Sequence, residues 1–108
     1  MAKYRKEKIK NGIKEITAMY IGKKSGSTSL ITVTDVALSD DGKRATILVN
    51  AFPRDKENAA CNFIKRSLGE IRKIIVRDLK INPVPFLDVK IDEGEKNRQK
   101  IDELLAKS

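Results

Sequence analysis

The sequence predicts one α+β domain in which a three-stranded sheet carries its helices on a single face. Apolar residues recur at helical spacing in two stretches, and three others have the alternation or β-branched content of strands. The 108 residues suffice for one hydrophobic core. The expected order is helix, strand, strand, helix, kink, helix, strand. We expect residues 1–92 to form this domain and residues 93–108 to form a tail, either a short helix or frayed.

The first helix is predicted over about residues 3–19 or slightly beyond. Four apolar residues step by four, three and four positions and share one side: Ile9, Ile13, Ile16 and Tyr20. Three lysines are expected on the opposite side: Lys6, Lys10 and Lys14. Gly22 and the residues after it are expected to end this helix, because glycine tolerates the left-handed geometry of a helix terminus.

Residues 29–39 and 43–52 are rich in β-branched residues and flank a DDG turn, so they predict a hairpin. In the second strand, one face is expected to carry Ala45, Ile47, Val49 and Ala51. In the first strand, the buried parity changes between Val33 and Val36. A bulge near Thr34 and Asp35 is therefore predicted, since it keeps both halves of the strand facing the core.

The stretch FIKRSLGEIRKII lies in a second helical region, which is expected to begin near Asp55 as its N-cap and to stop at Asn82 and the following prolines. Ser67 and Gly69 interrupt its apolar stripe, which predicts a kink between two helices. After it, the segment FLDVKID alternates as a third strand with Leu87, Val89 and Ile91 inward.

The net charge of +8, from 23 Lys and Arg against 15 Asp and Glu, implies a polyanionic partner. Residues 1–24 hold eight basic and two acidic groups, and residues 56–81 hold seven and three. Both excesses fall on predicted helices, so the positive field is expected on helical surface.

The composition argues against catalysis, a disulfide, a calcium site and a membrane segment. The chain contains no His, the usual general base, and its single cysteine, Cys61, reads as a small core residue that forms no internal disulfide. A hairpin turn explains the DDG residues better than a calcium loop does. No apolar run suits a signal peptide or a membrane span, so the expected compartment is the cytoplasm.

The predicted kink suggests a phosphate-binding surface. A break would expose backbone N–H groups at the start of the following helix, where an anion is favoured, and Gly69 would allow close approach of a sugar-phosphate chain. Ser67 would add a hydroxyl. Four cations surround the break: Lys65, Arg66, Arg72 and Lys73. Two other readings stay open: the cations form only a solvated face, or Gly69 permits a close helix-to-strand crossing.

The order of elements resembles that of type II KH domains, although the Gly-x-x-Gly loop is replaced. The stretch SLGEIRK is similar to the interrupted Ala-x-Gly kink of the ribosome-binding factor A family, a family of bacterial small-subunit assembly factors. Three more stretches resemble that family in the same order: ITVTDVALSDDGKRATILV, NPVPFLDVKID and KIDELL. Ser67 stands where the family has Ala, and Phe86 where an acidic residue is common.

This resemblance implies a non-catalytic ribosome biogenesis factor that binds immature 30S subunits and precursor 16S rRNA and assists rRNA maturation and end processing. It implies no cofactor, metal, membrane or small-molecule substrate, and a monomer is expected. By this resemblance, Ser67, Gly69 and Arg72 correspond to the kink region of the family. Charge placement adds nine candidate RNA contacts: Lys65, Arg66, Lys73, Arg77, Lys80, Lys3, Arg5, Lys6 and Lys10. The alternatives are a KH-type regulator of another RNA and a protein-interaction module.

Overall fold

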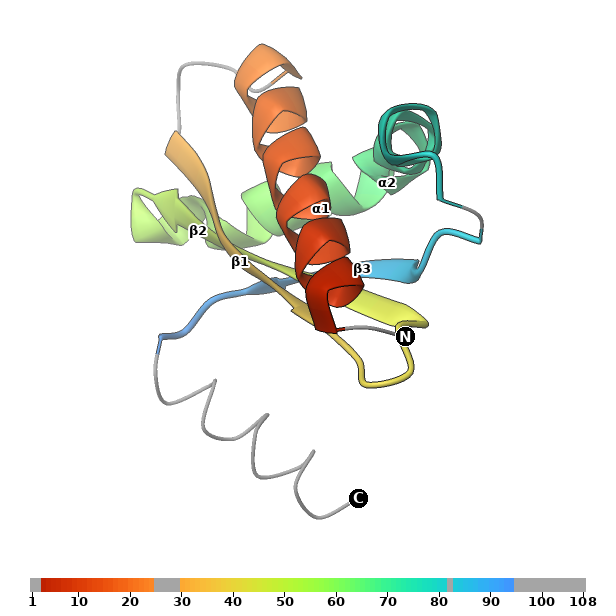
Figure 1. Cartoon of the computed structure of the whole chain (residues 1–108). Helices are drawn as coiled ribbons and strands as arrows, with labels where there is room; N and C mark the ends of the chain where they lie inside the picture. The colour runs from red at the N-terminus through yellow and green to blue at the C-terminus, as the bar shows by residue number, and fades with distance from the viewer. Residues whose placement is uncertain (1–2, 25–29, 82, 95–108) are drawn as a thin grey trace.

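The computed structural model describes residues 3–24, 30–81 and 83–94 and shows the predicted α+β class (Figure 1). The elements are α1 (Lys3–Lys24), β1 (Leu30–Leu38), β2 (Arg44–Phe52), a 3-10 helix η1 (Arg54–Lys56), α2 (Glu57–Leu79) and β3 (Phe86–Ile91). Residues 95–108 of the expected tail lie outside the described residues, so the division at residue 92 stays a prediction.

The sheet has the order β1-β2-β3, with β1 antiparallel and β3 parallel to the central strand. The predicted bulge is confirmed, because Val33 pairs with Val49 while Asp35 pairs with Leu48, which leaves Thr34 as the extra residue. Gly42 takes φ 72° in the hairpin turn, the conformation that the DDG sequence predicts.

Both helices contribute to one core on one face of the sheet, as predicted. Ile13 of α1 and Ile64, Ile71 and Ile75 of α2 are completely buried. They form a single cluster with strand residues such as Ile47, Val49 and Val89. The strands follow the predicted alternation, since every second residue of β2 and β3 faces the core.

Helix α2 corrects the prediction of two helices. It is one α-helix without interruption from Glu57 to Leu79, yet Figure 1 shows its axis changing direction between the green first half and the teal second half, which is seen end-on. The Ser67 hydroxyl donates to the carbonyl oxygen of Phe63 at 2.9 Å, a bond to the preceding turn that bends helices. The kink is therefore a bend within a continuous helix.

Helix α1 is longer than predicted and sits differently. It continues through Gly22 to Lys24, so Gly22 does not end it. Lys6 and Lys10 are half-buried beside the hairpin, where Lys10 Nζ lies 3.5 Å from Asp35 Oδ1. They flank the buried stripe of α1 rather than oppose it.

The start of α2 also differs from the prediction. Asp55 lies inside η1, and the N-cap position of α2 is occupied by Lys56, with no side-chain capping bond. The short 3-10 helix that follows β2 takes the place of the expected cap.

Gly12 has the packing role that one reading gave to Gly69. A Cβ built at Gly12 would lie 2.7 Å from Leu79 Cδ2, so glycine lets α1 approach the end of α2 closely. A Cβ at Gly69 would meet nothing within 4 Å, which makes the close-crossing reading of Gly69 wrong.

Candidate nucleic-acid interface

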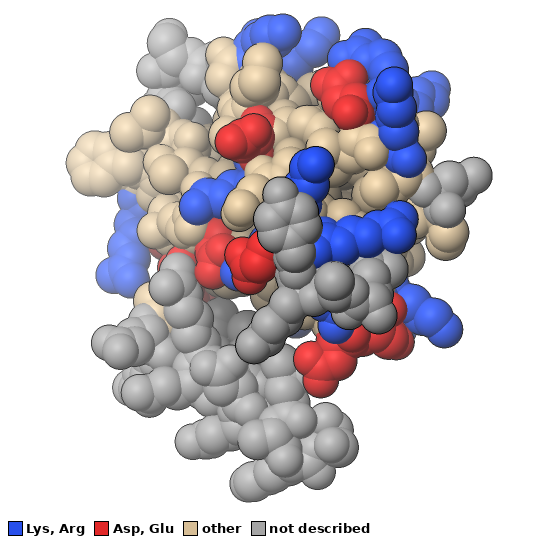
Figure 2. Space-filling view, viewed as in Figure 1, with Lys and Arg blue, Asp and Glu red and all other residues tan. Residues whose placement is uncertain are grey.

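Figure 2 shows basic side chains along the upper and right-hand edges of this face, over the C-terminal end of α1 and the second half of α2, and further ones in its centre and at its left edge. Acidic groups stand among them at several points. The local partners of each basic residue therefore decide which of the predicted RNA contacts are available.

Four cations from three parts of the chain meet around one groove of about 560 Å³, here called the basic groove. Arg5 and Lys6 come from the first turns of α1, Lys43 from the β1–β2 turn, and Arg72 from the second half of α2. Apolar residues line it between them, among them Ile9, Leu38, Pro83 and Phe86. A groove lined by both cations and apolar residues suits a chain that has both phosphates and bases.

The basic groove is held in shape by main-chain hydrogen bonds. The Arg72 guanidinium donates to the carbonyl oxygens of Val84 at 3.2 Å and Pro85 at 3.4 Å. Lys6 Nζ donates to the carbonyl oxygen of Asp40. The backbone N–H of Phe86 donates to the Lys43 carbonyl at 2.8 Å, which ties β3 to the hairpin turn.

Among the described residues that line this groove, Asp41 is the one that carries a carboxylate. Its carboxylate accepts hydrogen bonds from the Ser39 hydroxyl at 2.7 Å and from the Lys43 backbone N–H at 2.9 Å. The bond from Ser39, followed by that from Lys43, lowers the pKa of Asp41 below its ordinary value. Asp41 is thus a charged part of the turn, and four cations still outnumber it.

The other predicted cations lie outside the basic groove. Lys65, Arg66, Lys73 and Lys80 are exposed along and just after α2. Lys10 is paired with Asp35, and the side chain of Lys3 lies outside what the structure describes.

Arg77 is bonded to its neighbour on α2. Its Nε lies 2.8 Å from Asp78 Oδ1, and this hydrogen bond raises the pKa of Arg77 and lowers the pKa of Asp78. The pair is exposed and its net charge is zero, so Arg77 adds less to the positive field than an unpaired arginine would.

The phosphate clamp at the kink needs correction in two respects. Because α2 is continuous, the amides around Gly69 lie within a helix and not at the start of one. The prediction that a kink leaves backbone N–H groups free for phosphate is therefore wrong. Ser67 is buried at 7% exposure and its hydroxyl is already bonded to Phe63. Gly69 remains exposed, with open space where a Cβ would stand.

Two residues of the basic groove were missed from sequence. Lys43 belongs to the hairpin turn, which the sequence predicted only as a connection between two strands. Phe86 is the first residue of β3, and 65% of its surface is exposed. Parallel pairing of β3 beside β2 places Phe86 opposite Arg44, and no local pattern in the sequence gives that strand order. The unusual aromatic at position 86 was the available signal.

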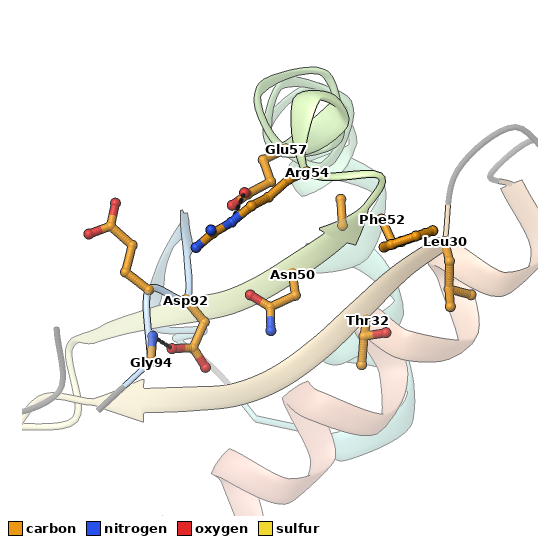
Figure 3. A pocket seen from close by; sticks show the side chains of 10 residues that line it. Leu30, Thr32, Asn50, Phe52, Arg54, Glu57, Asp92 and Gly94 are labelled. Atoms are coloured by element: carbon orange, nitrogen blue, oxygen red, sulfur yellow. Dashed lines mark hydrogen bonds and ion pairs between the residues drawn. The ribbon is translucent and has the colours of Figure 1, made fainter. Parts of the chain in front are cut away.

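A second pocket, of about 460 Å³, lies at the far end of the hairpin (Figure 3). Its charged lining is mixed, because Arg54 pairs with Glu57 at 3.4 Å while Asp92 and Glu93 add two carboxylates. Such a lining does not favour a phosphate chain. Among the described residues, no cluster of His, Cys, Asp or Glu could hold a metal ion, and no helix is long and apolar enough to cross a membrane.

Comparison with known proteins agrees with the resemblance seen in the sequence. A ribosome-binding factor A of Clostridium botulinum (strain Loch Maree / Type A3) is 32% identical over 97% of this chain and 91% of its own length. The protein of that name from Geobacter metallireducens is 30% identical over 94% of this chain and 88% of its own.

Solved structures show the same fold. The crystal structure of ribosome-binding factor A from Thermus thermophilus superposes with a TM-score of 0.69 at 24% identity, over 80% of this chain and 93% of that one, which confirms the predicted KH-like fold. A Thermus thermophilus RbfA homology model fitted into a cryo-EM map of a 30S-RbfA complex gives a TM-score of 0.64 at 26% identity, over 75% and 88% of the two chains.

The family match extends over nearly the whole chain. Residues 4–105 match ribosome-binding factor A. Because this range includes both helices, all three strands and the basic groove, the chain belongs to the ribosome-binding factor A family.

Proposed function

We propose that this protein binds immature 30S ribosomal subunits in the cytoplasm, acts on precursor 16S rRNA as a non-catalytic monomer, and assists maturation of its ends. The observation that carries the proposal is the basic groove, in which Arg5, Lys6, Lys43 and Arg72 meet in a member of this family. The 30S complex of the Thermus relative supports the choice of partner.

Electrostatics supplies a reason for subunit binding. Phosphates dominate the affinity of most RNA-binding proteins, and each contact with Lys or Arg releases counterions. Arg5 and Lys43 are exposed at the groove, while Lys65, Arg66 and Lys73 are exposed on α2. Their side chains have no hydrogen bond or ion pair to another described residue, so within this part of the chain nothing has to be broken before they contact phosphates.

Assistance without catalysis fits the same residues. The chain has no His, and the groove's four cations outnumber its one described carboxylate, Asp41, which is already bonded to Ser39 and Lys43 within the hairpin turn. The protein would favour one rRNA conformation by binding it more tightly than the others.

Sedimentation of the full chain with separated ribosomal particles tests the proposal. We expect the protein to travel with free 30S subunits, and more strongly with subunits that contain precursor 16S rRNA than with mature ones. Cells that lack the protein should accumulate 16S rRNA with unprocessed ends. Retention on messenger or small regulatory RNA in place of subunits would contradict the proposal and support a regulator of another RNA.

A further inference from the structure

We infer that the basic groove takes an unpaired nucleotide of RNA, with its base stacked on Phe86 and its flanking phosphates held by the surrounding cations. This inference rests on the proposed function and adds a stacking residue and the single-stranded state of the bound segment. The starting observation is Phe86, which lines the basic groove and is 65% exposed.

Exposure of one aromatic residue is ordinary, so the surroundings of Phe86 decide the argument. Phe52 is even more exposed, at 73%, but it lies beside Leu30 at the second pocket, whose charged lining is mostly acidic (Figure 3). Phe86 instead shares its groove with Arg5, Lys43 and Arg72. Of these two exposed rings, Phe86 is therefore the one with cations in place to hold the phosphates on either side of a stacked base.

The position of Phe86 is fixed by bonds that leave its ring free. Its backbone N–H donates to the Lys43 carbonyl at 2.8 Å, and the preceding Pro85 is buried with its carbonyl held by Arg72. In the sheet, Phe86 pairs with the exposed Arg44. A ring on a fixed backbone loses little conformational freedom when a base stacks on it, which favours binding.

The combination is the one that proteins use for single strands. A positive groove tracks the backbone, and an aromatic ring stacks on a base of any sequence. A fully paired RNA helix keeps its bases stacked internally and offers none to Phe86. The groove should therefore prefer unpaired RNA to a fully paired duplex of equal length, without strong preference for sequence.

The test compares Phe86→Ala with Phe52→Ala in the full chain, using a mixed-sequence single-stranded RNA of about ten nucleotides and a blunt duplex formed by that strand and its complement. We expect Phe86→Ala to weaken single-strand binding by about tenfold, the effect typical of one lost base stack. Phe52→Ala should stay within about twofold of the unchanged protein. Both variants should leave duplex affinity and melting temperature nearly unchanged, since both rings are exposed.

Fluorescence gives an independent readout, because the chain contains no Trp. Phe86→Trp should bind single-stranded RNA like the unchanged protein, and its emission should be quenched when a base stacks on it. Phe52→Trp should show no such quenching. Equal affinities of Phe86→Ala and Phe52→Ala for the single strand, or unquenched Trp at position 86, would overturn the inference. So would a loss of subunit binding by Phe86→Ala without loss of single-strand binding, which would indicate a protein contact.

Sedimentation of the unchanged protein with 30S subunits separates this inference from the proposed function. If the unchanged protein travels with subunits while Phe86→Ala and Phe52→Ala bind single-stranded RNA alike, only the stacking role fails. If the unchanged protein does not travel with subunits, the proposed function itself fails.

Discussion

Arg72 joins the second half of α2 to the loop before β3. Its guanidinium donates to the carbonyl oxygens of Val84 and Pro85, both buried residues. A surface arginine read from sequence as an RNA contact is thus also part of the fold. Any loss of RNA binding in an Arg72 variant must be separated from a loss of this loop.

Arg72→Ala should lower the free energy of unfolding by about 1–2 kcal/mol, because it removes charged hydrogen bonds to two carbonyls. Thermal unfolding should show a fall of several degrees. Lys73→Ala is the matched control, since it removes the adjacent, exposed cation. Equal melting temperatures for the two variants would mean that the bonds of Arg72 contribute nothing to the fold.

Asp41 has a measurable signature in the pH dependence of stability. Its pKa is lower in the folded chain than its ordinary value of 3.8, so the charged carboxylate favours folding at neutral pH. This contribution is full above the unfolded pKa and is lost as the pH falls through the lower folded value. Asp41→Asn keeps an acceptor oxygen but removes the charge.

Asp41→Asn should therefore lower the melting temperature slightly at pH 7, and the difference should shrink as the pH falls below the ordinary Asp pKa of 3.8 and through the lower pKa of Asp41 in the folded chain. Melting curves of both proteins from pH 2 to pH 7 check this. Asp40→Asn removes the same charge from the same turn and should have the smaller effect at pH 7. A difference that does not change with pH would show that the charge of Asp41 is not what stabilises the turn.

At the scale of elements, α2 bends without breaking. Ser67 accounts for the bend through its bond to Phe63, and Gly69 adds a position with no side chain on the exposed side. Gly69 has no left-handed φ and no crowded neighbour, so nothing in the described fold requires glycine there. Close approach of RNA at Gly69 therefore stays a prediction.

Gly69→Ala separates stability from binding. We expect it to stabilise the protein by about 0.5–1 kcal/mol, because alanine is the better helix former at an open helical position. Binding to 30S subunits should weaken if RNA approaches this point. Gly12→Ala is the contrasting variant and should stabilise the protein less than Gly69→Ala does, since the Leu79 side chain must shift away from the new Cβ. A less stable Gly69→Ala protein would show that the bend itself needs glycine.

Local sequence patterns predicted the elements well where a pattern had a single physical explanation. The parity change between Val33 and Val36 required a bulge, and the bulge is present at Thr34. Gly69 was harder, because helix propensity registers a poor helix former but cannot distinguish a break from a bend. The hydroxyl of Ser67 decided between them, through a bond that depends on its rotamer.

At the scale of the whole molecule, the functional surface was only partly predictable. Helical spacing and charge identified Arg5, Lys6 and Arg72, but their meeting with Lys43 depends on how α1, α2 and the hairpin turn pack together. Sequence also could not show that Lys10 pairs with Asp35 of β1, whereas the partner of Arg77, Asp78, is its neighbour in the chain. Charge counts give the total field, whereas packing decides where it is free to act.

The central claim is that cations of the basic groove contact RNA phosphates of the small subunit. If about five phosphates are contacted in all, the affinity for 30S subunits should fall with a log-log salt slope of about −3 to −4. Removal of two groove cations should make that slope shallower, since each lost phosphate contact removes part of the counterion release. A matched pair of cations lies on the same helix as Arg5 but about 27 Å away, at 1.5 Å per residue: Lys23 and Lys24.

The decisive measurement is the affinity for 30S subunits as a function of salt for the unchanged protein, Arg5→Ala/Lys43→Ala and Lys23→Ala/Lys24→Ala. The account predicts a slope shallower by about 1.4 for the groove variant and little change for the control, which loses the same charge. Identical slopes for the two double variants would contradict it, because net charge alone would then explain the binding.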